Sequence, residues 1–134
     1  HEGSVDFKRF SKNVETMIRF FQKHDIDIIW MSTHPIIEGD MKNRSYFYGR
    51  HDPEKYLHCK PNALMEKACE ITKHICNGLN VLHLDLFHDE RMQESEKVLR
   101  TLQNSGEDDG VHYGPKGAQY VAKRLEEILE EAKK

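Results

Sequence analysis

The run NVLHLDLF at residues 80–87 decides the fold class of this 134-residue chain. It is a short apolar segment with the length of a strand. A similar run, IDIIWMS at 26–32, is rich in the β-branched and aromatic residues typical of a buried strand. Between the two, residues 62–77 have a helical period, with an apolar stripe of Leu64, Ala68, Ile71 and Ile75. Strand, helix and strand in this order predict a right-handed parallel βαβ unit.

The flanking segments extend this unit to a single α/β domain over residues 1–134. Apolar residues at three- and four-residue steps predict a helix over 5–24, and Pro115 opens a last amphipathic helix. Residues 36–60 have no clear period and predict a long loop, and 91–103 form a weaker helix pattern. Parallel sheets normally have more than two strands and are covered on both faces. The chain therefore looks like the back part of an α/β fold whose front strands are missing.

Composition and charge exclude several classes of protein. Hydrophobic residues make up 37% of the chain and charged residues 32%, and the mean hydropathy is −0.78. No apolar run reaches the roughly 18 residues of a membrane-spanning helix. The net charge of −3 argues against nucleic acid as a partner. We expect no membrane span and no nucleic-acid partner.

The cysteines predict free thiols. Cys69 and Cys76 stand seven residues apart on the predicted helix, which separates them by about 10 Å along its axis, too far for a disulfide. The total of three cysteines is odd, and the N-terminal residues contain no apolar leader segment. Both observations favour a reducing, cytoplasmic compartment.

The sharpest chemical feature is the string Asp109-Gly-Val-His112, which precedes the last helix. A carboxylate three residues before an imidazole on a turn can accept a hydrogen bond from one ring nitrogen and thereby fix the tautomer. The other nitrogen is then available to take a proton from a hydroxyl. The pair suits a general base and the residue that orients it.

The longer string DDGVHYGPKGAQYVAKRL, residues 108–125, resembles the last block of SGNH/GDSL-type esterases. The run DIIWMSTHP at 27–35, together with VLHLD at 81–85 and the Asp-Gly-Val-His string, most resembles the PC-esterase branch of that superfamily. The resemblance implies a three-layer, flavodoxin-like fold with a parallel sheet. It also implies that Asp109 and His112 are two members of a Ser-His-Asp triad, and that the reaction needs no cofactor and no metal.

The early blocks of that superfamily are not found in this sequence. There is no Gly-Asp-Ser block for the nucleophile, no early oxyanion-hole glycine and no GxND block. The chain resembles the C-terminal two thirds of such a domain, so a second chain or an N-terminal segment would supply the serine and complete the sheet. The implied function is an esterase or acyl hydrolase acting on a small-molecule or glycan ester. The alternatives are a noncatalytic binding module of the same fold and a sugar O-acyltransferase.

Polar residues at the predicted strand ends are candidates for substrate binding, because ligands of open α/β sheets bind at the carboxyl ends of the strands. His34 follows the first strand, and Asp85 and His88 lie at the end of the second. A metal site built from His83, Asp85, His88 and His112 is a further alternative. Ordinary hydrogen bonding beside an active site is the favoured interpretation.

Overall fold

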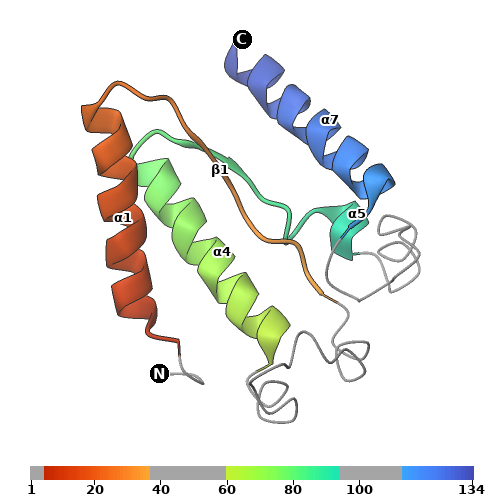
Figure 1. Cartoon of the computed structure of the whole chain (residues 1–134), viewed down its shortest axis with the longest axis horizontal. Helices are drawn as coiled ribbons and strands as arrows, with labels where there is room; N and C mark the ends of the chain where they lie inside the picture. The colour runs from red at the N-terminus through yellow and green to blue at the C-terminus, as the bar shows by residue number, and fades with distance from the viewer. Residues whose placement is uncertain (1–4, 37–59, 94–112) are drawn as a thin grey trace.

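The computed structural model describes residues 5–36, 60–93 and 113–134 (Figure 1). The elements in chain order are α1 (Phe7–Lys23), β1 (Ile29–Met31), α4 (Pro61–Gly78), β2 (Leu82–Leu84), α5 (Glu90–Gln93) and α7 (Pro115–Ala132). Strands β1 and β2 pair in parallel, with Ile29 opposite Leu82 and Met31 opposite Leu84. This confirms the α/β class and the parallel strand–helix–strand arrangement. Most of the predicted loop at 36–60 and of the helix predicted at 91–103 lies outside the described residues.

Local sequence signals explain where the helices begin and end. Asp6 caps α1, because its side chain accepts a hydrogen bond from the backbone N–H of Arg9 at 3.1 Å. Pro61 and Pro115 each occupy the first turn of their helix, where a missing N–H costs nothing. After α1 and α4, Asp25 and Asn80 adopt left-handed backbone conformations with φ of 55° and 56°. Asp and Asn tolerate this region better than most residues, and here they turn the chain from a helix into the next strand.

The two strands lie between helices on both sides (Figure 1). On one side, α1 and α4 enclose a buried cluster of Val14, Ile18, Cys76 and Val81. On the other side, α7 packs on a second cluster of Leu84, Leu86, Met92 and Val121. Val81, just before β2, belongs to the first cluster, whereas Leu84 of β2 and Leu86 after it belong to the second, as expected for a chain segment covered on both faces.

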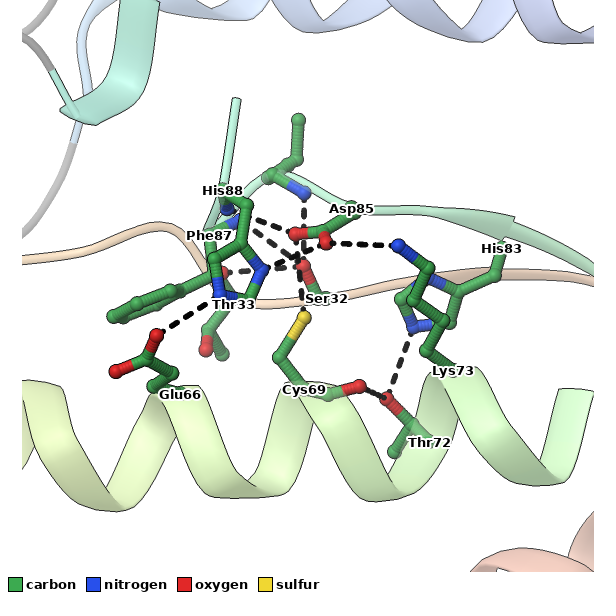
Figure 2. Close-up of polar contacts among 11 residues, drawn as sticks. Ser32, Thr33, Glu66, Cys69, Thr72, Lys73, His83, Asp85, Phe87 and His88 are labelled. Carbon is green, nitrogen blue, oxygen red and sulfur yellow. Dashed lines mark hydrogen bonds and ion pairs between the residues drawn. The ribbon is translucent and has the colours of Figure 1, made fainter. Parts of the chain in front are cut away.

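The buried stripe of α4 differs from the predicted one. Its most buried side chains are Cys69, Thr72 and Cys76, whereas the predicted Leu64, Ala68, Ile71 and Ile75 are half-buried. The reason is that α4 contacts both α1 and β2, so the centre of its buried surface lies between two partners. As Figure 2 shows, the side chain of Thr72 points toward His83 of β2, and that of Cys69 points toward Asp85, which follows β2.

Within the described residues, no helix combines the length and the apolar character needed to cross a bilayer.

Candidate functional site

Polar side chains gather where the two strands end (Figure 2). Ser32 directly follows β1, and Asp85 directly follows β2. Glu66, Cys69 and Lys73 reach the same place from α4. The carboxyl edge of a parallel sheet is the usual ligand-binding edge of α/β proteins, so this position is where a site is expected.

Ser32 joins the two strand ends. Its backbone N–H donates to the carbonyl of Leu84 at 3.0 Å, which extends the pairing by one residue. Its hydroxyl oxygen accepts from the backbone N–H groups of Leu86 and Phe87, at 2.9 and 3.2 Å. The residue is 6% exposed. Ser32 therefore satisfies buried backbone donors and is not placed to act as a nucleophile.

Asp85 is the centre of the cluster. One carboxylate oxygen accepts from the backbone N–H of His88 at 2.8 Å and from the thiol of Cys69 at 3.3 Å. The other oxygen lies 2.8 Å from Nδ1 of His88 and 3.7 Å from Nζ of Lys73. Burial acts to raise the pKa of the Asp85 carboxyl, but the donors from His88 and Cys69 outweigh burial and the net pKa is lowered.

The ring of His88 lies between two carboxylates. Its Nδ1 faces Asp85, and its Nε2 lies 3.0 Å from Oε1 of Glu66. An ionised carboxylate can only accept, so each ring nitrogen must carry a proton to make both bonds. The hydrogen bonds to Asp85 and Glu66 accordingly raise the pKa of His88. In this state the imidazolium links α4 to the end of β2, and neither nitrogen is available as a base.

The sequence analysis missed the three residues that α4 contributes to the cluster: Glu66, Cys69 and Lys73. They stand three and four residues apart and so share one face of α4, and Asp85 and His88 are three residues apart after β2. Burial raises the pKa of the Cys69 thiol to about 11, so the thiol is protonated and donates to Asp85. The prediction that Cys69 and Cys76 are free thiols is confirmed.

His83 lies apart from this cluster. The hydroxyl of Thr72 donates to the carbonyl of Cys69 at 2.9 Å, so Nε2 of His83 must donate to the Thr72 oxygen, 3.0 Å away. That tautomer leaves a lone pair on Nδ1, which is buried and has no hydrogen-bond partner within the described residues. Burial also lowers the pKa of His83, which keeps the ring neutral. Of the residues in the alternative metal site of the sequence analysis, Asp85 and His88 contact each other, whereas His83 forms its hydrogen bond with Thr72.

His34 lies beside Tyr113, two residues before the start of α7. The ring centroids of His34 and Tyr113 are 5.0 Å apart, in an edge-to-face arrangement at 61°. Tyr113 also packs on the buried cluster beneath α7. Tyr113 directly follows His112 in the sequence, whereas Asp109 and His112 themselves lie outside the described residues.

An open polar pocket lies between the end of β2 and α7, and both Asp85 and His88 line it. Asp89 also lines the pocket and connects it to α7. This buried carboxylate accepts from the hydroxyl of Tyr120 at 2.6 Å and from Nε of Arg124 at 3.1 Å. Lys73 and Lys123 complete the charged rim. The pocket gives a solute a route to the exposed side of the cluster.

No protein-family model matches this chain, and a comparison with curated proteins found no match to its sequence.

Proposed function

We propose that this chain is the C-terminal part of a carboxyl-ester hydrolase of the SGNH type, with Asp109 and His112 as two members of its triad. In this mechanism a serine from a preceding segment or a second chain attacks the ester carbonyl carbon. His112 takes the hydroxyl proton and then gives it to the departing alcohol, and Asp109 orients the ring. Water, deprotonated by His112, then releases the acid from the acyl-enzyme.

The contact between Tyr113 and His34 carries this proposal. In this contact Tyr113, which follows His112 in the sequence, lies beside His34, three residues past the end of β1 at the carboxyl edge of the sheet. Consecutive Cα atoms are about 3.8 Å apart. A general base at position 112 would therefore need no rearrangement of the described residues to serve a substrate at this edge.

The serines in the described part of the chain also favour a nucleophilic serine that comes from a preceding segment or a second chain. It contains two serines, of which Ser32 is buried and accepts two backbone N–H groups, and Ser11 lies on α1. Cys69 is excluded as a nucleophile because its pKa of about 11 leaves the thiol protonated.

The exposed face of β1 favours additional strands. Met31 is 42% exposed, although its parallel pairing with β2 is typical of sheets covered on both faces. In the proposal, further strands of the complete sheet would pair along the other edge of β1, and the helices that connect them would cover this side chain. The strand order of this complete sheet is proposed to be flavodoxin-like, as the resemblance to SGNH/GDSL-type esterases implies.

Substrate contacts are proposed for His34 and His88, which line the same edge. Asp85 lines the same pocket, and its oxygens also accept from His88 and Cys69, so in this proposal it positions His88 at the substrate. The substrate would be a small-molecule or glycan ester.

The test is reaction of the full-length protein with a fluorophosphonate probe and with a chromogenic acetyl ester. We expect labelling of one serine. The variant His112→Ala should lower ester hydrolysis by about 10³-fold or more, and Asp109→Asn should also lower it by orders of magnitude. His74→Ala is the matched control, since His74 is exposed on α4 and should leave the rate unchanged.

Retained hydrolysis in folded His112→Ala would remove the assignment. Absence of labelling in the folded wild-type protein would favour a noncatalytic binding module. Transfer of the acetyl group to an added sugar in preference to water, lost in His112→Ala, would identify an O-acyltransferase that uses the same residues.

A further inference from the structure

We propose that Cys69, Asp85 and His88 form a binding site for a divalent transition-metal ion, for which zinc is the best match. This inference does not depend on the proposed esterase activity. One sulfur, one carboxylate oxygen and one ring nitrogen from these residues all lie within 4.8 Å of one another. Thiolate, imidazole and carboxylate together are the ligand types of zinc sites.

The spacing of the ligand atoms suits a tetrahedral ion. Bonds of about 2.0 to 2.3 Å place tetrahedral ligands about 3.3 to 3.8 Å from one another. Sγ of Cys69 lies 3.3 Å from one oxygen of Asp85, and Nδ1 of His88 lies 2.8 Å from the other. The contact between Nδ1 and Asp85 would have to lengthen by about half an ångström to admit an ion where these three side chains meet, and the ligand atoms of the three residues already lie within 4.8 Å of one another.

Protons now occupy the positions that an ion would take. The Cys69 thiol and Nδ1–H of His88 both donate to the same carboxylate. A divalent ion that displaces these two protons leaves the total charge of the cluster unchanged. The exchange therefore avoids leaving an uncompensated charge beside the buried sulfur.

Glu66 is placed to orient His88 as a metal ligand. With Nδ1 on the ion, Nε2–H of His88 still donates to Glu66, at the present 3.0 Å. A carboxylate on the second nitrogen is the usual partner of a metal-bound histidine. Glu70 adds a second carboxylate near the exposed side of His88. Lys73 is a positive charge that opposes the binding of a cation, because its Nζ lies 3.7 Å from Asp85. The side chain of Lys73 is 55% exposed, so it can turn into solvent when an ion binds.

The site would have three protein ligands and one open position. His88 is partly exposed and lines the pocket beside α7, so an ion and a fourth ligand can enter from that side. Open sites of this kind bind water or a small anion at the fourth position.

The test is titration of the chelator-treated, full-length protein with Co²⁺ and Zn²⁺, followed by absorption spectroscopy and calorimetry. We expect one ion per chain and a sulfur-to-cobalt charge-transfer band. Cys69→Ser should abolish that band, whereas Cys76→Ser, which replaces the other buried thiol of α4, should keep it. Glu66→Gln should weaken binding by about 10- to 100-fold. Lys73→Ala should tighten it.

If Cys69→Ser does not fold, His88→Gln gives a second test, because His88 lies at the surface and its loss should still weaken Co²⁺ binding by at least about tenfold. Failure of the folded wild-type protein to bind an equivalent of Co²⁺ or Zn²⁺ would overturn the proposal. So would a charge-transfer band that survives in Cys69→Ser and disappears in Cys76→Ser. Ester hydrolysis is read separately, so either proposal can fail without the other.

Discussion

The two faces of β2 differ in character: one is apolar and packs on α7, and the other is polar and faces α4. One face presents Leu84, continued by Leu86, to α7 and contains only apolar side chains at its centre. The other face presents His83, continued by Asp85, to α4, where both side chains make specific polar contacts. The alternation of the strand separates a packed layer from a polar site within a few ångströms.

The difference shows where stability and chemistry are located in this molecule. Packing against α7 tolerates apolar exchange provided that volume is kept. The face toward α4 requires that each donor meets an acceptor, because an unsatisfied buried polar group costs free energy. Ser32 marks the boundary, since it directly follows β1 but satisfies the N–H groups of Leu86 and Phe87.

The largest effect is expected on the apolar face. Leu84→Ala should lower the free energy of unfolding by about 2 to 5 kcal/mol, because Leu84 is 2% exposed and the surrounding cluster would retain a cavity. Urea denaturation of both proteins measures the change. The control is Leu129→Ala on α7, whose side chain is 41% exposed and whose loss should cost well under half as much. Equal costs for the two variants would contradict the packing described for α7.

A smaller loss is expected at the boundary between the faces. Ser32→Ala should cost about 1 to 3 kcal/mol, because two buried backbone donors lose their acceptor. Amide hydrogen exchange should show faster exchange at Leu86 and Phe87. Thr33→Ala, an exposed neighbour, serves as the comparison. Unchanged protection of both amides would show that Ser32 does not hold the strand ends together.

The smallest effect is expected within the polar face. Thr72→Val keeps the shape of the side chain but removes the acceptor for Nε2 of His83, and should cost about 1 kcal/mol. The ring nitrogen chemical shifts of His83 report the tautomer directly. In the wild-type protein we expect a proton on Nε2 and none on Nδ1. The opposite tautomer would contradict the hydrogen-bond direction inferred from Thr72.

The sequence predicted the helices and the parallel pair of strands because their signals are local. The apolar period of α1, the proline at the start of α7 and the two short apolar runs each act within a few residues. The strands are shorter in the structure than the runs at 26–32 and 80–87. Most outer residues of these runs belong to neither a paired strand nor a turn, and Asn80, with its left-handed backbone, lies in the turn before β2.

The candidate site was predicted less completely. Asp85 and His88 were expected at the carboxyl edge, since strand ends are recognisable in a sequence. Glu66 and Cys69 were not, because the angle at which α4 faces β2 depends on packing against α1. The roles of Asp109 and His112 stay predictions, since these residues lie outside the described ranges.

By itself, the sequence determined the order of the elements, the apolar alternation of β2 and the absence of a Cys69–Cys76 disulfide, all of which depend on spacing along the chain. Only the tertiary structure decided that His88 bonds to both Asp85 and Glu66, that Ser32 is an acceptor for the opposite strand, and that His83 turns to Thr72. Apart from the His88–Asp85 pair, which is three residues apart, these contacts join residues that are 11 to 55 positions apart. Their partners are selected by how α4 packs on the sheet, which no local pattern specifies.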